Sequence, residues 1–222
     1  MTVLERVLDR ESTVYVACGV TLALGLVFIF VRAPHPWGSE GFDHYHQLAL
    51  TVASGAPFPT MDVPWGYAYF LAAFYRAFGD HPSIPLTVQA ALNALVPLLV
   101  FQLASHWVPK RTAILAALLA GLLSFNTVYA STQSSDAVCT VTFLAALLAF
   151  VRATASGRLA LYALSGILLG VAPQFRPNLI LVPATLAAYM LLSRSVVGAR
   201  LTGAAALLAS AGLALAPWTV RN

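Results

Sequence analysis

The chain has 222 residues, of which 59% are hydrophobic and 9% are charged, with a formal net charge of +4. A soluble globular domain carries about 25% charged residues, so this chain has too few to cover a water-facing surface. Its basic residues stand singly or in pairs between apolar runs, which is typical of membrane topology signals and excludes a phosphate-binding patch for nucleic acid. The composition indicates an all-α, polytopic transmembrane bundle.

Seven apolar segments are predicted to cross the membrane and to form one transmembrane domain over residues 1–222. Their ranges are 12–31, 86–107, 112–130, 137–151, 159–171, 179–192 and 201–218. The fourth to sixth are shorter than the roughly 20 residues that a spanning helix needs. We therefore expect the polar stretches 134–136 and 174–178 to lie at membrane depth, facing protein or a cavity.

Charged residues between these segments predict the orientation. With a cytoplasmic N-terminus, eight of the 12 basic residues lie on the cytoplasmic side, as the positive-inside rule requires. Most of the acidic residues then lie on the opposite side: Glu40, Asp43, Asp62, Asp80 and Asp136. This distribution predicts an extracytoplasmic working face.

The segment 33–85, between the first two predicted spans, is a long external connection with two expected interfacial helices. On a period of about 3.6 residues, one helical face is polar: Glu40, Asp43, His44, Gln47 and Thr51. The opposite face is mainly apolar: Tyr45, Leu48, Ala49 and Val52. A second helix is predicted over residues 66–78, with aromatic rings suited to the lipid headgroups: Trp65, Tyr67, Tyr69 and Tyr75.

Polar residues of this loop have two interpretations. Acids and histidines on a surface helix commonly serve solubility, and we assign Glu40, His35 and His46 to this class, whereas Asp43 is the candidate for chemistry. Asp43, His44 and His46 are close in sequence, but His46 projects about 200° from His44 on a helix, so both cannot bind one ion. The chain has no nucleotide, P-loop or zincin motif. We expect no cofactor, with a divalent metal as the less favoured alternative.

Three further residues stand next to the ends of predicted spans. Asp136, in "STQSSDAVCT", is either the acidic start of a capped helix or a functional acid at membrane depth. Arg176, in "QFRPNL", either binds a lipid phosphate through its guanidinium or extends to the headgroups without a specific ligand. Arg221, in "PWTVRN", has the same two interpretations.

The order of several stretches resembles the GT-C membrane glycosyltransferases of the dolichyl-phosphate-mannose protein mannosyltransferase and aminoarabinose transferase branch. They are Asp43 with a following "LA" and Gly55, then "PWGYAYFLAAFYRAFG", "VQAALNALVPLLVFQLA", "STQSSDAVCTVTFLAALLAF", "LSGILLGVAPQFRPNLILVPA" and "APWTVRN". The resemblance implies a polyprenyl-phosphate-linked sugar as donor and a glycan, lipid or protein as acceptor. Family members run well beyond this length, so we expect the N-terminal membrane portion of such an enzyme.

The resemblance also implies residue roles. Asp43 occupies the position of the general base, with Glu40 as the competing acid, and Asp136 occupies the position of a second acid. Arg176 lies in an "RP" element common in the family. We also expect substrate contacts from His44, Gln47, Tyr67 and Arg221. Two other functions stay open: a transporter or flippase for a lipid-linked intermediate, and a non-catalytic membrane subunit.

Overall fold

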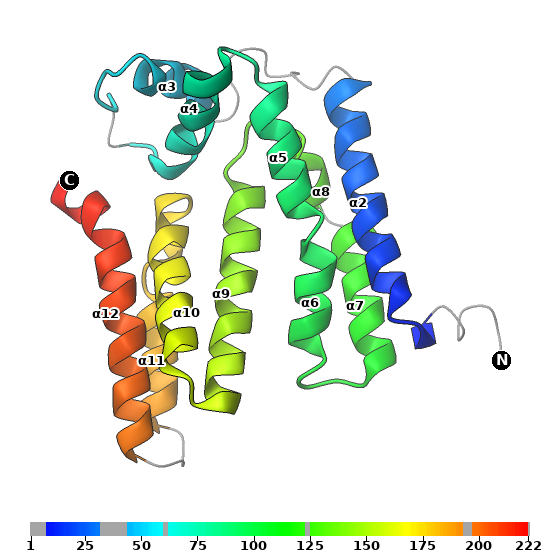
Figure 1. Ribbon diagram of the computed structural model, residues 1–222, viewed down its shortest axis with the longest axis vertical. Coiled ribbons are helices and arrows are strands. Elements are labelled where there is room, and N and C mark those ends of the chain that lie inside the picture. The colour runs from blue at the N-terminus through cyan, green and yellow to red at the C-terminus, as the bar shows by residue number, and fades with distance from the viewer. Residues whose placement is uncertain (1–7, 32–43, 60–61, 123–124, 193–196, 222) are drawn as a thin grey trace. The chain divides into compact units, whose positions relative to one another are not determined.

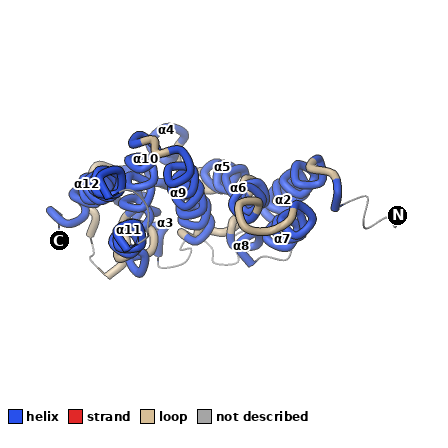
Figure 2. The backbone as a smooth tube through the Cα atoms, turned by 90° about the horizontal axis from the view of Figure 1, so that it is seen from below, coloured by secondary structure: helices blue, strands red, loops and turns tan. Residues whose placement is uncertain are grey.

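The computed structural model describes residues 8–31, 44–59, 62–122, 125–192 and 197–221. Every regular element within these ranges is a helix, as expected (Figures 1 and 2). The chain divides into two compact units, Met1–Val141 and Thr142–Asn222, which are described separately below.

The first unit contains seven helices and the start of an eighth among its described residues. They are α2 (Ser12–Phe30), α3 (Tyr45–Ala53), α4 (Gly66–Phe78), α5 (Ser83–Asn93), α6 (Val96–Ala104), α7 (Lys110–Leu122), α8 (Phe125–Tyr129) and the first turns of α9 (Asp136–Ser156). The second unit continues α9 and adds α10 (Leu159–Val171), η2 (Ala172–Gln174), η3 (Pro177–Leu179), α11 (Val182–Leu192) and α12 (Val197–Arg221).

Four described stretches are long and apolar enough to cross a membrane: Ser12–Phe30, Ser83–Ala104, Asp136–Ser156 and Leu201–Val220. They coincide with the first, second, fourth and seventh predicted segments. The helices of the other predicted segments are shorter than a spanning helix. Helices α7 and α10 have 13 residues each, and α11 has 11. The prediction of apolar helices is confirmed, whereas seven spans and the orientation stay predictions.

Helix α2 packs against α5, α6 and α7 through one face (Figure 1). That face is built largely from small residues, and its buried members are Val14, Ala17, Thr21, Gly25 and Ile29. A Cβ atom at Gly25 would lie 3.0 Å from the Cβ of Ala90, so the glycine allows α2 and α5 to approach closely. Large apolar side chains on the other faces of α2, such as Phe30, are exposed, as is typical of a lipid-facing surface.

Helices α3 and α4, which lie between the first two predicted spans, pack against each other. The ring centroids of Tyr45 and Tyr67 lie 4.9 Å apart in an edge-to-face arrangement. The guanidinium of Arg76 donates to the carbonyls of Val52 and Ala53, at 2.6 and 3.3 Å, and so satisfies the C-terminal end of α3. Gly79 ends α4 with a φ of 81°, a conformation that favours glycine.

These two helices test the predictions for the loop. Helix α4 has the predicted bounds, and α3 buries the predicted apolar face while His44 and Gln47 are exposed. The headgroup position predicted for the α4 aromatic residues is wrong for Tyr67 and Tyr75, because both are buried. They lie on the side of α4 that packs inward, where their hydroxyls meet polar partners.

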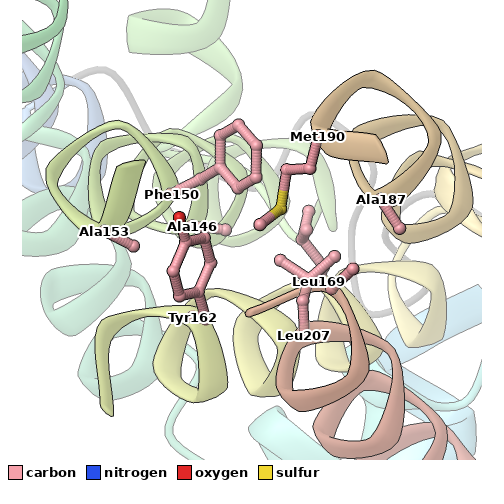
Figure 3. Close-up of a cluster of buried hydrophobic side chains, with 9 residues drawn as sticks. Ala146, Phe150, Ala153, Tyr162, Leu169, Ala187, Met190 and Leu207 are labelled. Atoms are coloured by element: carbon pink, nitrogen blue, oxygen red, sulfur yellow. The ribbon is translucent and has the colours of Figure 1, made fainter. Parts of the chain in front are cut away.

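The second unit is built around α10 and α12, which pack closely side by side (Figures 1 and 2). A Cβ atom at Gly166 or Gly170 would collide with the α12 carbonyls of Leu207 or Ala211. Figure 3 shows the core, in which Phe150, Tyr162, Leu169, Met190 and Leu207 meet among alanines. The Ser165 hydroxyl donates to the carbonyl of Ala146 at 2.9 Å and joins α10 to α9.

Candidate functional site

Residues 131–135 form a buried polar segment between α8 and α9 in the first unit. It reads Ser131, Thr132, Gln133, Ser134 and Ser135, and each of these residues is at most 5% exposed. Buried polar groups are costly unless they are hydrogen-bonded, and more so at membrane depth. The partners of this segment therefore determine how its neighbour Asp136 is held.

Gln89, near the middle of α5, supplies one set of partners. Its side chain is fully buried, and Nε2 donates to the carbonyls of Ala130 and Thr132 at 3.0 and 2.9 Å. Its Oε1 accepts a hydrogen bond of 2.7 Å from the Tyr67 hydroxyl. Burial raises the pKa of Tyr67 well above its ordinary value, so this hydroxyl stays protonated and remains a donor.

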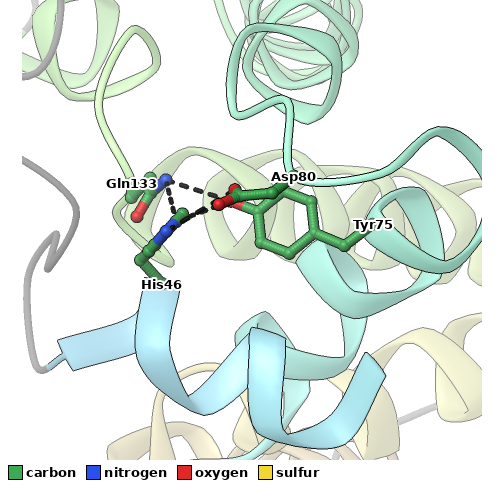
Figure 4. Close-up of polar contacts among 4 residues, drawn as sticks. All are labelled: His46, Tyr75, Asp80 and Gln133. Atoms are coloured by element: carbon green, nitrogen blue, oxygen red, sulfur yellow. Dashed lines mark hydrogen bonds and ion pairs between the residues drawn. The ribbon is translucent and has the colours of Figure 1, made fainter. Parts of the chain in front are cut away.

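The second set of contacts is made by Gln133 of the polar segment. Its side chain and those of His46, Tyr75 and Asp80 point toward one another (Figure 4). The Gln133 Nε2 atom lies 3.1 Å from the Tyr75 hydroxyl oxygen and 3.2 Å from His46 Nδ1. The same His46 nitrogen lies 3.0 Å from the Tyr75 hydroxyl, and His46 Nε2 lies 3.6 Å from a carboxylate oxygen of Asp80. Burial, and secondarily the Asp80 charge, raise the pKa of Tyr75 above its ordinary value.

Asp136 follows the polar segment and begins α9. It is partly buried, its Oδ2 accepts a hydrogen bond of 3.0 Å from the Ser134 hydroxyl, and its own N–H donates to that hydroxyl at 3.4 Å. A carboxylate in the first turn also lies at the positive end of the helix dipole. The position predicted for Asp136, at the start of the fourth apolar helix, is confirmed.

A family comparison gives this geometry its context. The model of the dolichyl-phosphate-mannose-protein mannosyltransferase family matches residues 62–219, well over half of the chain. The chain belongs to this family. It is accordingly an integral-membrane glycosyltransferase of the mannosyltransferase type. Neither the curated proteins nor the solved structures give a match to it.

Within this mannosyltransferase, the predicted site residues of the first unit fall into three groups. Asp136 and Tyr67 lie in the first unit and in the family match, at the polar segment described above. His44 and Gln47 are exposed at the start of α3, and His44 has a left-handed backbone with a φ of 57°. Glu40 and Asp43 lie outside the described residues, as does His35, which was assigned to solubility.

Tyr67 differs from the other predicted substrate contacts because it is completely buried. Its hydroxyl is engaged by Gln89, so the contact that the structure gives it is a structural one. A role for Tyr67 in substrate binding stays a prediction.

Arg176 and Arg221 belong to the second unit. Arg176 is exposed between η2 and η3, with the extended backbone expected before Pro177, and its N–H donates to the Ala172 carbonyl at 3.0 Å. Arg221 is the last residue of α12, and its side chain lies outside the described residues. Both phosphate-binding predictions stay predictions.

The prediction that His46 serves solubility on an exposed face is wrong, because its side chain is 3% exposed. The angle of about 200° from His44, which argued against a shared metal ion, also turns His46 toward the buried face of α3. Within the part of the chain that the structure describes, no cluster of three or more His, Cys, Asp or Glu side chains is placed to hold a metal ion.

Sequence reasoning did not single out Gln89, Tyr75, Asp80 or Gln133 as members of a site. One signal was available: Gln89 interrupts an apolar span, and a polar side chain there requires a protein partner. Its partners could not be deduced, because the segment that it binds lies 40 or more residues further along the chain.

Proposed function

We propose that this chain transfers a sugar from a polyprenyl-phosphate donor to an acceptor hydroxyl at the extracytoplasmic face of the membrane. The observation that carries the proposal is the family match over residues 62–219. The site geometry supports it, because the match includes a carboxylate, Asp136. This residue follows a buried polar segment and begins the apolar helix α9.

The proposed reaction is a direct displacement. The acceptor oxygen attacks the anomeric carbon and gives its proton to a carboxylate, Asp43 or the nearby Glu40. The bond between the anomeric carbon and the phosphate oxygen breaks, the polyprenyl phosphate leaves, and the anomeric configuration inverts. General-base assistance of this kind contributes roughly 10²–10⁴-fold to the rate.

Other residues have supporting roles in this proposal. Asp136 acts as the second acid and accepts hydrogen bonds from substrate hydroxyls, and Arg176 stabilises the negative charge of the departing phosphate. His44 and Gln47, exposed at the start of α3, contact the acceptor or sugar. Arg221 is a second candidate for the phosphate. No resident cofactor is needed for this displacement.

A transporter or flippase is the second candidate. Such proteins place charged sites near the midplane, usually on broken helices in corresponding positions of repeated halves. Asp136 instead begins its helix, and α3 and α4 belong to the same unit as the polar segment before it. These observations favour chemistry at a membrane surface.

The experiment is a transfer assay with purified protein in nanodiscs, polyprenyl-phosphate mannose as donor and a panel of hydroxyl acceptors. Asp43→Asn and Asp136→Asn should each reduce turnover by about 100-fold or more without loss of the folded protein. Asp62→Asn, which removes an exposed acid from the same external segment, is the matched control. Wild-type turnover in both test variants would contradict the proposal, and an arm with chelator tests for a divalent metal.

A further inference from the structure

The turn between α10 and α11, residues 172–179, is joined to α12 by the side chain of Gln174 (Figure 1). Its Nε2 atom donates to the Ala214 carbonyl at 2.8 Å and lies 3.5 Å from the Gly170 carbonyl. A carbonyl oxygen can only accept, so the short contact places the NH₂ group of the amide there. The side chain is half-buried in a unit with a mainly apolar interior, where water offers little replacement for a lost hydrogen bond.

The same turn carries Arg176, two residues after Gln174. The N–H of Arg176 donates to the Ala172 carbonyl at 3.0 Å, and its carbonyl accepts from the N–H of Leu179 at 3.2 Å. Its backbone is extended, as Pro177 requires of the residue before it. These restraints all lie within the turn, so they hold Arg176 relative to Gln174. The position of Arg176 relative to α12 depends on how the whole turn is held.

Apolar contacts hold the turn as well, but with less direction. Phe175 is buried, and Pro173 lines an apolar cavity together with Ala211 and Leu215 of α12. Burial of apolar groups is non-directional, whereas a hydrogen bond has a preferred distance and angle. The bond from Gln174 is therefore the contact that selects one position of the turn along α12.

We propose that Gln174 is a positioning residue for Arg176. Its hydrogen bond to Ala214 fixes the turn against α12 and so determines where the exposed guanidinium meets a phosphate. The consequence for sugar transfer rests on the proposed role of Arg176 at the departing phosphate, whereas the anchoring of the turn by Gln174 does not.

The first test is the transfer assay with polyprenyl-phosphate mannose in nanodiscs. Gln174→Met keeps the approximate size of the side chain and removes its N–H donors. Negative charge on the phosphate grows as the sugar leaves, so a displaced Arg176 guanidinium lowers kcat more than it changes the donor KM. We expect kcat to fall about tenfold.

A double-mutant cycle separates positioning from stability. In an Arg176→Ala background, Gln174→Met should lower kcat by less than about twofold, because the group that it positions is already gone. A residue that only keeps the protein folded would lower kcat by the same factor in both backgrounds. Equal factors would therefore overturn the inference.

Thr185→Val is the matched control in the same unit. Thr185 is exposed on α11, and its hydroxyl donates to the Val182 carbonyl within its own helical turn at 2.8 Å. The variant removes a hydrogen bond that does not join the turn to α12, so it should leave kcat unchanged. A fall as large as that of Gln174→Met would overturn the specific role of Gln174.

A nitroxide label measures the anchoring without any substrate. It is attached at Asn178→Cys, an exposed position of the turn, in a background with Cys18→Ala and Cys139→Ala. Loss of the hydrogen bond should let the turn move more freely. Gln174→Met should therefore narrow the EPR lines of the label, whereas Thr185→Val should not. Identical spectra with and without Gln174 would overturn the anchoring.

The two proposals fail separately. If Arg176→Ala leaves transfer intact while the mobility of the label depends on Gln174, the proposed phosphate role fails and the anchoring stands. If transfer needs Arg176 but Gln174→Met acts equally in both backgrounds, the positioning role alone fails.

Discussion

In the first unit, buried polar side chains lie next to α3 and α4, whereas the interior of the second unit is formed mainly by aliphatic and aromatic groups. Gln89 and Gln133 each join segments that are distant in sequence, through hydrogen bonds. In the second unit, Gly166 and Gly170 instead let α10 and α12 approach until their backbones nearly touch.

The difference matters because apolar side chains gain little by leaving lipid for a helix interface. A membrane protein therefore relies on close packing, hydrogen bonds or both. The second unit uses close packing, which is broken by an added methyl group. The first unit adds directional hydrogen bonds, which are broken by an apolar isostere. Four substitutions test this contrast, in order of decreasing expected effect.

Gln89→Leu should have the largest effect on stability. It leaves the Tyr67 hydroxyl and the carbonyls of Ala130 and Thr132 buried without their partner, at a cost of about 3 kcal/mol. Denaturation in a graded series of SDS and mild detergent measures the change. Gln102→Leu, at a half-buried position of α6, is the control and should lose much less. Equal losses would show that the hydrogen bonds of Gln89 are not what holds the first unit.

Gly166→Ala should destabilise the second unit by about 2 kcal/mol, because the new methyl group collides with Leu207 and Ser210 of α12. The control is Gly212→Ala in the same unit, where an added Cβ meets no atom within 4 Å. That variant should be neutral or slightly stabilised through helix propensity. Tryptophan fluorescence during the same detergent titration reports both, and similar behaviour of the two variants would refute close packing at Gly166.

Tyr75→Phe should cost about 1 kcal/mol, since the hydroxyl contacts both His46 and Gln133. The variant also has a pH signature. The folded pKa of Tyr75 is raised, so above about pH 10 the unfolded state releases a proton that the folded state keeps, and stability falls as pH rises. Stability measured against pH should fall less steeply for Tyr75→Phe than for wild type. Parallel curves would contradict this.

Asp9→Asn should have the smallest effect. Asp9 accepts a hydrogen bond of 2.8 Å from Arg111, which lowers the pKa of its carboxyl, but the pair is open to solvent and screened by salt. Any stabilisation is present at neutral pH and is lost as the pH falls through this lowered pKa. Comparing Tm at low and high salt checks the prediction, and a loss as large as that of Tyr75→Phe would show that surface pairing has been underestimated.

Periodicity predicted the parts of the fold that depend on neighbouring residues. It gave the buried face of α3, and the apolar, aromatic-rich stretch gave the bounds of α4, because each depends on a side-chain pattern within a few turns. The same periodicity placed His46 on the buried face. The error was to assign the residue by its polarity rather than by its position on the helix.

The candidate site was predictable only in part. Asp136 was recognisable because a short polar run precedes an apolar helix. The contact between Gln133 and His46 joins residues 87 positions apart, and no local pattern specifies such a pair. Gln89 likewise donates to backbone carbonyls, which every residue has, so these partners cannot be identified from the sequence.

The chain order of these contacts bears on synthesis. His46, Tyr67, Tyr75, Asp80 and Gln89 all precede residues 131–135 in the chain. When the ribosome adds the polar stretch, the side chains of His46, Tyr75 and Gln89 that bind it have already been made, because translation proceeds N-terminal end first, and Asp136, which binds Ser134, follows directly. The nascent segment can thus be accommodated on arrival, without waiting for later residues to enter the bilayer.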